Sequence, residues 1–481
     1  MIILGINDSS HDASLAVLRD TEILFAAHAE RYNKEKNTYS IPSELLNEAL
    51  SHGKPDVIAY FEKRNRKRLR HALLGGINGE YKNLYKKNTK VLDGVAEVQV
   101  GHHRSHASAG YYTSGFSNAT TVVIDAIGEF ETATIWDCSG VKLKKVYSTR
   151  YPTSFGLFYS AFTKLLDLKP GTEEYILMGM AGFGDRGRFY EKVNSYFPKF
   201  NFQPQNMHTG ISENSFQILS EQDKYDIAAA VQSVYEDRLI EFMAFAKKIS
   251  KSDNLVFMGG CALNCVANTK LLPIWKNIWI MPNPGDSGSS LGAAASIAGR
   301  HLEWSGPYLG YEINNNYQVD NIVNNLVSNG IVGVASGRAE FGPRALGNRS
   351  LLADPRAAFN KDAVNKIKKR EMFRPFAPVV LEEHASEWFD MDRPSPYMQF
   401  AFRCLKSEII PAVVHVDGTS RVQTVSRVQH EGLYSVLKKW FEITGVPVLL
   451  NTSLNIKNQP LLNDEDDARM WDVSNPGILI L

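Results

Sequence analysis

The sequence predicts an α/β protein of two domains, and three observations carry this prediction. Two stretches, residues 1–30 and 120–149, each alternate three short apolar strands with polar turns. Two later stretches, 254–272 and 277–299, each run from an apolar strand through a Gly-containing loop into a helix. From about residue 330 the chain becomes rich in arginine and glycine. We therefore expect one domain over residues 1–318 and a second over residues 319–481.

The first two stretches repeat one structural unit. Their strands are expected over 1–7, 13–19 and 22–30, and again over 120–125, 130–137 and 141–149. Asn7 ends the first strand of one unit and Asp125 ends the first strand of the other. A duplicated three-strand unit followed by helices is typical of the actin and sugar-kinase (ASKHA-type) fold, in which nucleotide lies against the turns between the two halves.

The composition is that of a globular protein. Hydrophobic residues make up 44% and charged residues 22% of the 481 residues, and the net charge is +1. No apolar run approaches the ~20 residues of a membrane helix, and the N-terminus begins as a strand rather than a signal peptide. The four cysteines are too scattered for a disulfide framework, so we expect Cys261 and Cys265 to be core thiols. These features favour a cytoplasmic protein without a membrane partner.

One segment is strongly basic. Residues 62–90, EKRNRKRLRHALLGGINGEYKNLYKKNTK, hold ten Lys or Arg against two Glu. A solvated helix face is the simpler interpretation. The alternative is a track for an anionic substrate such as nucleic acid.

Three histidines lie among small residues in the stretch GHHRSHASAGYYTSGF, residues 101–116. On a helix His102 and His106 share a face at i,i+4, and His103 and His106 share one at i,i+3. This spacing lets two imidazoles hold one metal ion, but it suits ordinary histidines of a closely packed helix equally well.

Glycines stand between strand and helix in the two strand–loop–helix units. Gly259 and Gly260 follow one strand, and the loop PNPGDSG follows the other. Such turns let a phosphate approach backbone N–H groups. Asp286, in this second loop, lies where its carboxylate could share a metal ion with Asp125.

Seven motifs, in this order, resemble those of the O-carbamoyltransferases typified by the NodU, CmcH and TobZ proteins: HHRSHASAG, GGCALNCVAN, PGDSGSSLGAA, EFGPRALGNRSLLADPR, REMFRPFAP, HVDGTSRVQTV and NTSLN. The resemblance covers the chain from residue 1 to the C-terminus. It implies an N-terminal actin-like domain, similar to the ATPase of tRNA threonylcarbamoyladenosine synthesis, and a C-terminal YrdC-like domain.

The resemblance also implies a reaction. Carbamoyl phosphate and ATP give carbamoyl-adenylate in the C-terminal domain, with release of pyrophosphate and phosphate. An acceptor hydroxyl then attacks the carbamoyl carbon in the actin-like domain, and AMP leaves. Enclosing both steps in one protein protects the labile adenylate from water.

In the first domain, the residues that match family positions have the following implied roles. The metal ligands are His102, His106, Asp125 and Asp286, with iron as the family's metal and manganese or zinc also suited to two imidazoles and two carboxylates. His103 is then a supporting or packing residue. His11 matches a histidine beside the acceptor and is the candidate general base, although a turn-capping role is the alternative. Lys36 matches a basic residue that steadies phosphate, and the residues expected to border the nucleotide are Gly128, Gly259, Gly260 and Asn264.

In the second domain, Lys368-x-Arg370 and Ser453-x-Asn455 match the KxR and SxN pairs of YrdC-like domains, which hold nucleotide and acyl-phosphate oxygens. Four arginines match the family motifs and are expected around carbamoyl phosphate and the ATP phosphates: Arg344, Arg349, Arg374 and Arg421. Mg²⁺ is a further expected companion of ATP.

The chain departs from the family pattern at three points. The family's D-G-x-G-E reads Asp125-Ala126-Ile127-Gly128-Glu129, so one glycine of the expected phosphate loop is alanine. In EYILMGMAGFG, Ile176 stands where lysine is usual and Gly182 where proline is usual. The chain is also shorter than many relatives, which would leave the acceptor pocket more open.

Several hypotheses remain open at this point. The acceptor is a small molecule or sugar, or a hydroxymethylated base in DNA such as 5-hydroxymethylcytosine, towards which segment 62–90 tilts the balance. A tRNA-modifying ATPase of the threonylcarbamoyl pathway is the alternative enzyme, but the fused KxR and SxN domain argues against it. A non-catalytic nucleotide-binding partner is disfavoured because all four candidate ligands are present. The sequence is compatible with a homodimer.

Overall fold

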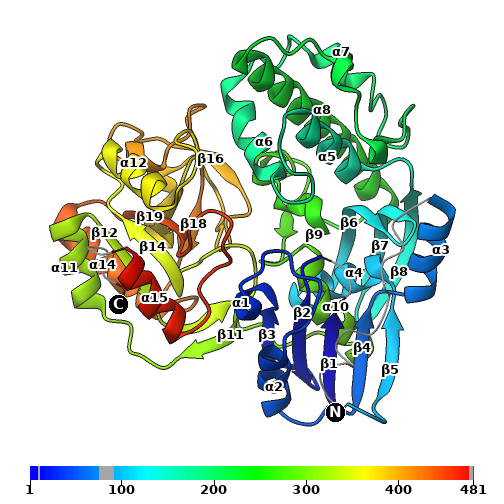
Figure 1. The fold of residues 1–481 in the computed structure, drawn as a ribbon, viewed down its shortest axis with the longest axis horizontal. Helices are drawn as coiled ribbons and strands as arrows, with labels where there is room; N and C mark the ends of the chain where they lie inside the picture. Colours follow the sequence, from blue (N-terminus) through cyan, green and yellow to red (C-terminus); the bar gives the residue numbers. More distant parts are fainter. Residues whose placement is uncertain (9–10, 75–91, 476–479, 481) are drawn as a thin grey trace. The chain divides into compact units, whose positions relative to one another are not determined.

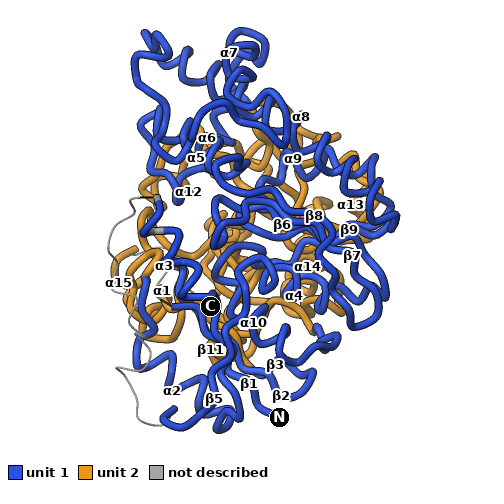
Figure 2. Tube along the Cα trace, turned by 90° about the vertical axis from the view of Figure 1, so that its right-hand side faces the viewer, with its two compact units in different colours: residues 1–24, 39–304 blue, residues 25–38, 305–481 orange. Residues whose placement is uncertain are grey.

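The computed structural model describes residues 1–8, 11–74, 92–475 and 480. The chain divides into two compact units, which Figure 2 shows in different colours. Unit 1 comprises Met1–Leu24 and Tyr39–Trp304, and unit 2 comprises Phe25–Thr38 and Ser305–Leu481. The boundary expected at residue 318 therefore lies inside unit 2, which also includes a short segment near the N-terminus.

Unit 1 contains two five-stranded sheets of the same topology (Figure 1). The first has the order β3-β2-β1-β4-β5 and consists of β1 (Ile2–Asn7), β2 (Ser14–Arg19), β3 (Glu22–His28), β4 (Val57–Phe61) and β5 (Ala96–Val100); the unit boundary falls within β3. The second has the order β8-β7-β6-β9-β10 and consists of β6 (Asn118–Gly128), β7 (Glu131–Ser139), β8 (Lys142–Arg150), β9 (Asn254–Met258) and β10 (Asn277–Trp279). In the first sheet β1 is antiparallel to β2 and parallel to β4. In the second sheet β6 is likewise antiparallel to β7 and parallel to β9. The duplicated three-strand unit is therefore confirmed.

Two helices of small residues pack together between these sheets. Helix α4 (His102–Thr113) packs on β6 and β9, and α10 (Ser289–Ala298) packs on β1, β2 and β4. A Cβ atom at Gly292 of α10 would lie only 2.0 Å from the carbonyl oxygen of Ser105 on α4. Small residues are therefore needed for the close approach of the two helices. This contact confirms the closely packed helix expected at residues 101–116.

The other helices of unit 1 cover its outer faces. Helices α5 and α8 pack on the second sheet, and α8 begins at a capping box formed by Ser220 and Asp223. The bounds are α2 (Ser43–Ser51), α3 (Arg64–Leu74), α5 (Phe155–Leu165), α6 (Glu174–Met180), α7 (Tyr190–Asn194), α8 (Glu221–Ser250) and α9 (Cys265–Thr269). Among the described residues, no helix is both long enough and apolar enough to cross a membrane. All four cysteines lie in the described ranges and are free thiols.

Unit 2 is a second mixed α/β structure. Its main sheet has the order β12-β14-β19-β15-β18 and consists of β12 (Ile331–Ala335), β14 (Arg349–Ala353), β15 (Ala377–Leu381), β18 (Gln423–Val425) and β19 (Val448–Ser453). Two strand pairs accompany it: β11 (Tyr308–Ile313) with β13 (Gly337–Glu340), and β16 (Ala401–Arg403) with β17 (Thr419–Arg421). The helices are α1 (Glu30–Asn33), α11 (Val319–Asn329), α12 (Ala358–Ile367), α13 (Ala385–Trp388), α14 (Glu431–Thr444) and α15 (Glu465–Ser474). Helices α11 and α14 share an apolar core with the main sheet, centred on the buried Trp440. Both units thus have the predicted α/β class.

Candidate functional site

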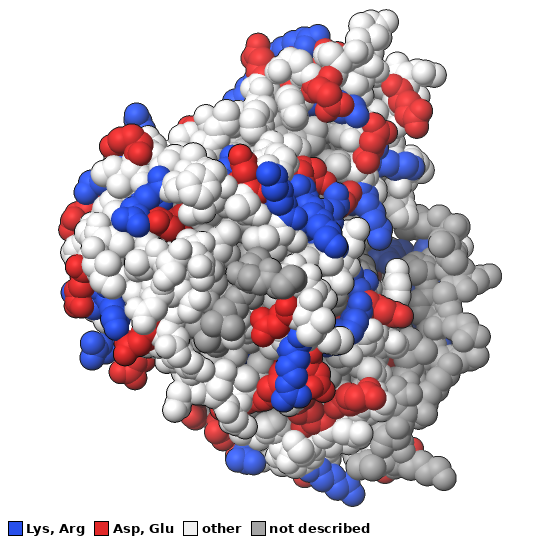
Figure 3. Space-filling view, turned by 60° about the vertical axis from the view of Figure 1, so that its left-hand side comes forward, with Lys and Arg blue, Asp and Glu red and all other residues white. Residues whose placement is uncertain are grey.

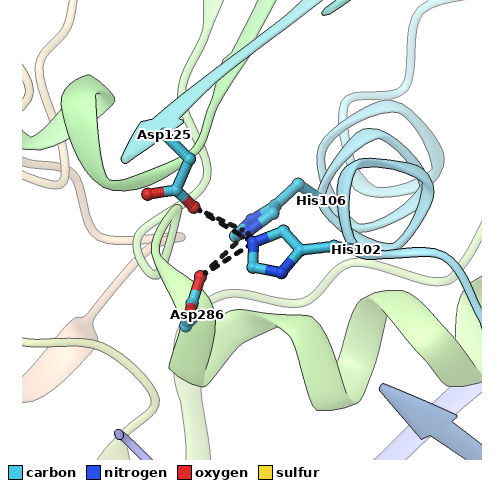
Figure 4. A group of neighbouring side chains, drawn as sticks. All are labelled: His102, His106, Asp125 and Asp286. Atoms are coloured by element: carbon cyan, nitrogen blue, oxygen red, sulfur yellow. Dashed lines mark hydrogen bonds and ion pairs between the residues drawn. The ribbon is translucent and has the colours of Figure 1, made fainter. Parts of the chain in front are cut away.

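The four side chains predicted to hold a metal ion converge in unit 1. His102 and His106 lie one turn apart on α4, Asp125 lies on β6, and Asp286 opens the short 3₁₀ turn that precedes α10. Figure 4 shows both imidazoles pointing toward the two carboxylates. One ligand atom from each residue lies within 4.8 Å of all the others. The i,i+4 spacing on α4 therefore places both histidines on the face that meets Asp125 and Asp286.

The size of this cluster fits a divalent cation. His106 Nε2 is 3.3 Å from His102 Nε2 and 3.1 Å from Asp286 Oδ1, and each of the two Nε2 atoms is 3.3 Å from Asp125 Oδ2. Four ligands placed about 2.0–2.1 Å from the centre of a tetrahedron are separated by about 3.3–3.4 Å. Two imidazoles and two carboxylates are also a donor set that suits iron, manganese or zinc.

The surrounding hydrogen bonds orient these ligands. His106 Nδ1 lies 3.0 Å from the carbonyl oxygen of Pro284, which can only accept, so Nδ1 carries a proton and, in the neutral ring, the lone pair lies on Nε2. His102 Nδ1 lies 2.9 Å from Glu62 Oε2, with the same consequence. The backbone N–H of Ala126 donates to Asp125 Oδ1 at 2.7 Å, which leaves Oδ2 directed at the histidines.

The electrostatics of the cluster favour positive charge. Burial opposes ionisation of all four side chains, but the carboxylates raise the pKa of His102 well above its usual value and raise that of His106 as well. Burial and Asp286 oppose ionisation of Asp125, yet the two imidazoles lower its pKa to about 2; the histidines also hold the pKa of Asp286 well below its usual value. Protons on the histidines and a divalent cation would therefore compete for the same lone pairs.

The predicted nucleotide-binding glycines lie against this cluster. A Cβ atom at Gly128 would lie 2.4 Å from His102 Cδ2, and one at Gly259 (φ +93°) would lie 2.1 Å from the carbonyl oxygen of Ile124. A Cβ atom at Gly260 would lie 3.3 Å from Asp125 Oδ1. Asn264 caps α9 by accepting the Ala267 N–H at 3.0 Å. The role of these residues toward adenosine stays a prediction.

His103 and His11 have different surroundings from the two ligands. His103 is buried, with Nδ1 2.9 Å from Thr134 Oγ1, and burial lowers its pKa well below the usual value. It is a neutral packing residue beside the cluster. His11 lies at the edge of the cluster, with Nδ1 3.0 Å from Asp12 Oδ2 and Nε2 3.7 Å from Asp286 Oδ2. The hydrogen bond to Asp12 raises the pKa of His11 to about 9, and the charge of Asp286 acts in the same direction while desolvation of the ring opposes the shift. This pKa is above the near-neutral value expected for a general base.

Three basic residues of α3 have acidic partners within unit 1. Arg64 pairs with Glu97, Lys67 with Glu62 and Arg66 with Glu129, while Arg70 donates to the carbonyl oxygens of Ile127 and Glu129. Residues 75–90 of the basic segment lie outside the described residues. On the face that Figure 3 shows, basic and acidic side chains are interspersed. A nucleic-acid track along 62–90 stays a prediction.

A second group of predicted residues comes together in unit 2. Buried Lys368 donates through Nζ to Ser453 Oγ at 3.1 Å and to Asn455 Oδ1 at 2.9 Å. Arg370 donates to Asn365 Oδ1 at 2.6 Å and its guanidinium lies over the Phe376 ring. Burial, followed by the charges of Arg370, Arg374 and Lys36, holds the pKa of Lys368 well below its usual value. Lys36 therefore belongs to this group, although its position in the sequence put it in the first domain.

The motif arginines of unit 2 differ in their surroundings. Arg349 is fully buried and its guanidinium donates to the carbonyl oxygens of Tyr311, Ser336, Gly337, Asn348 and Asn463. Its donors thus hold neighbouring backbone segments together. Arg374 lies 3.4 Å from Glu371, and Arg344 and Arg421 are half-buried. Contact of these arginines with phosphate stays a prediction.

Ile176 replaces the lysine that is usual in the family, so this position carries no cation. Its side chain lies on α6 and is buried in the core. Gly182 lies in the 3₁₀ turn Ala181–Phe183 that follows α6. Glu62, the partner of the candidate ligand His102, was not predicted from the sequence. The available signal was an acidic residue directly after the apolar run VIAYF, as Asn7 and Asp125 directly follow the apolar residues of MIILGIN and TTVVID in the sequence.

Comparison with known proteins identifies the family. The chain matches the carbamoyltransferase N-terminus profile over residues 72–295 and the carbamoyltransferase C-terminus profile over residues 323–476. It is 30% identical to an uncharacterized protein, sll1178, of Synechocystis sp., over 97% of this chain and 93% of that protein. The nodulation protein NolNO of Sinorhizobium fredii is 31% identical over 96% of this chain and 76% of its own length, and nodulation protein U of Rhizobium tropici is 37% identical over 51% and 46%. The chain therefore belongs to the carbamoyltransferase family and is a carbamoyltransferase enzyme.

Proposed function

We propose that the chain is an O-carbamoyltransferase that uses ATP and carbamoyl phosphate and passes the carbamoyl group through carbamoyl-adenylate to an acceptor hydroxyl. The observation that carries this proposal is the presence of two distinct polar sites in one chain of the carbamoyltransferase family. One is the His102, His106, Asp125 and Asp286 cluster of unit 1. The other is the Lys368, Ser453 and Asn455 group of unit 2.

In the proposed first step, unit 2 forms the adenylate. Water first cleaves carbamoyl phosphate to carbamate and inorganic phosphate. A carbamate oxygen then attacks the α-phosphorus of ATP, the new P–O bond forms, and the bond to the leaving pyrophosphate breaks. Both substrates are anions, so the step needs cationic donors that offset their repulsion. Lys368 is buried among oxygen acceptors and is close enough to Lys36, Arg370 and Arg374 to be influenced by their charges. This concentration of positive charge supports an anion-binding role for the group. The same role was predicted from the KxR and SxN motifs, which hold nucleotide and acyl-phosphate oxygens in YrdC-like domains.

In the proposed second step, unit 1 carries out the transfer. The acceptor hydroxyl attacks the carbamoyl carbon, the new C–O bond forms, and the bond to the adenylate oxygen breaks to release AMP. The four ligands would hold a divalent cation, with iron as the first candidate, that supplies Lewis-acid polarisation of the carbamoyl group. His11 is the candidate acceptor of the hydroxyl proton. Neutralisation of Asp286 by a cation would remove one cause of the raised pKa of His11 and favour its basic form.

For the acceptor, the structure supports a small hydroxyl compound or a sugar more than DNA. Three of the described basic side chains on α3, those of Arg64, Arg66 and Lys67, already pair with glutamates. Paired cations release fewer counterions on binding a polyanion and so contribute less to affinity.

The two half-reactions provide the test. The protein is incubated with ATP, labelled carbamoyl phosphate and a panel of hydroxyl acceptors that includes sugars and hydroxymethylated DNA. Pyrophosphate release reports the first step and labelled acceptor reports the second. We expect His106→Ala and Asp286→Ala to abolish transfer and spare pyrophosphate release, and Lys368→Ala to abolish pyrophosphate release. Equal loss of both half-reactions in each variant would contradict the division of labour.

A further inference from the structure

Glu62 is a buried carboxylate whose two oxygens have different partners. It follows β4 directly, and its side chain is only 6% exposed. Oε2 lies 2.9 Å from His102 Nδ1, and Oε1 lies 2.8 Å from Lys67 Nζ on α3. A carboxylate is costly to bury unless it is paired, so Lys67 makes it possible to keep this charge behind His102.

The two histidine ligands are held by chemically different groups. The Nδ1 atom of His106 meets the carbonyl oxygen of Pro284, whereas that of His102 meets a carboxylate. A carbonyl fixes the tautomer and the orientation of the ring. A carboxylate does the same and also makes the imidazole a stronger donor to a cation. Glu62 therefore orients His102 as the Pro284 carbonyl orients His106, and it also places a negative charge beside the ring.

The preceding residue restricts the same ring from another side. Phe61 is 1% exposed, and its ring centroid lies 4.6 Å from that of His102. With one face against Phe61 and Nδ1 on Glu62, the His102 ring presents only Nε2 to Asp125 and Asp286. The end of β4 therefore positions this ligand through two consecutive residues.

We propose that Glu62, supported by Lys67, is the positioning residue for His102 and thereby sets the affinity of unit 1 for a divalent cation. This inference rests on the metal centre of the proposed function. The charges agree with it, because the two carboxylate ligands offset a divalent cation while Glu62 and Lys67 offset each other. Lys67 is then the residue of α3 that gives electrostatic support to the metal centre.

The test compares Glu62→Ala and Glu62→Gln with Glu97→Gln in the full chain. Glu97 is a matched control because it also pairs with a basic residue of α3, Arg64, through contacts of 2.5 and 3.2 Å. Zn²⁺ affinity is measured by competition with a chromophoric chelator, and thermal unfolding in EDTA reports folding without metal. Loss of such a supporting partner typically weakens metal binding by about 10–100-fold.

We expect Glu62→Ala to weaken Zn²⁺ binding by about 10–100-fold and Glu62→Gln by less, since one amide oxygen can still accept from His102. Glu97→Gln should bind within twofold of the wild type. Glu62→Gln is nearly isosteric, so it keeps the test valid if the alanine variant does not fold. If the wild type binds Zn²⁺ and both Glu62 variants bind within twofold of it, or if Glu97→Gln loses as much affinity, the inference is wrong. If the wild type binds no divalent cation, the metal centre itself is wrong and this inference with it.

Discussion

Gly128→Ala should displace a candidate metal ligand without removing any polar group. Gly128 ends β6, and a Cβ atom built on it would lie 2.4 Å from His102 Cδ2 and 2.6 Å from His103 Cδ2. Because carbon atoms in contact lie about 3.5–4.0 Å apart, one of these rings or the end of β6 must move by about 1 Å. Two of the three nearest atoms, Cδ2 at 2.4 Å and Cγ at 2.6 Å, belong to His102, so the displacement falls largely on this ring.

The expected magnitude follows from the packing around the ring. Insertion of one methyl group into a filled interior costs about 1–3 kcal/mol. Metal–ligand distances tolerate changes of only about 0.2 Å, so the cluster of 3.1–3.4 Å separations cannot absorb a 1 Å displacement of His102 Nε2. If the strain is expressed mainly when the cation binds, affinity should fall by about 5- to 150-fold.

The assay is Zn²⁺ competition with a chelator, with the transition temperature of the metal-free protein measured in parallel. Gly285→Ala is the control, because a Cβ atom there meets nothing within 4 Å although the residue adjoins Asp286. Gly285→Ala should bind like the wild type. Unchanged affinity in a folded Gly128→Ala protein would refute the view that this glycine makes room for the histidines.

Three further predictions concern chelation, pH and a buried arginine. Chelation of divalent cations without Mg²⁺ depletion should stop carbamoyl transfer, and pyrophosphate release should continue; loss of both would contradict the separation of the two sites. In metal-free protein the raised pKa of His102 stabilises the fold fully below pH 6.5, and this stabilisation is lost as the pH rises. The pKa of Asp125, lowered to about 2, stabilises the fold fully above pH 3.8, and this stabilisation is lost as the pH falls. The lowered pKa of the buried His103 acts in the opposite direction to that of His102, because stability is lost as the pH falls below 6.5. The free energy of unfolding from urea titrations should therefore be highest near pH 6.5, and a maximum above pH 8 would contradict this. Arg349→Lys should lower that free energy by at least about 3 kcal/mol because several buried carbonyls lose their donor, whereas Arg356→Lys, which alters a partly exposed pair with Asp354, should cost less than about 1 kcal/mol.

Features with a short-range pattern could be predicted from the sequence. Alternating apolar strands gave the repeated unit, because side-chain period and turn residues are local properties. The i,i+4 spacing placed His102 and His106 on one helical face. The convergence of Asp125 and Asp286 on that face agrees with their places near the end of β6 and in the turn after β10, because parallel strands direct their carboxyl ends to the same edge.

Features that depend on long-range contacts could not be predicted in this way. Lys36 follows a strand of unit 1 in sequence, yet it joins unit 2, where it influences Lys368. Nothing in its neighbours indicates this, since a unit boundary inside β3 reflects tertiary contacts rather than composition. Arg349 matches a motif rich in arginine, but only the structure reveals that its guanidinium is surrounded by carbonyl oxygens.

The basic helix α3 illustrates the same limit for electrostatics. The sequence supplies a count of charges, whereas the field outside a protein depends on which charges remain unpaired and exposed to water. The side chains of Arg64 and Lys67 are each 13% exposed and have carboxylate partners within 3 Å. Cations of this kind exchange few counterions with solvent, so they contribute little to binding of a polyanion. They can, however, stabilise carboxylates in the protein interior, and Lys67 does this for the carboxylate behind His102. Arg64 and Lys67 of the basic run that suggested a nucleic-acid track are therefore paired inside unit 1, and Lys67 supports the candidate metal-binding cluster through Glu62.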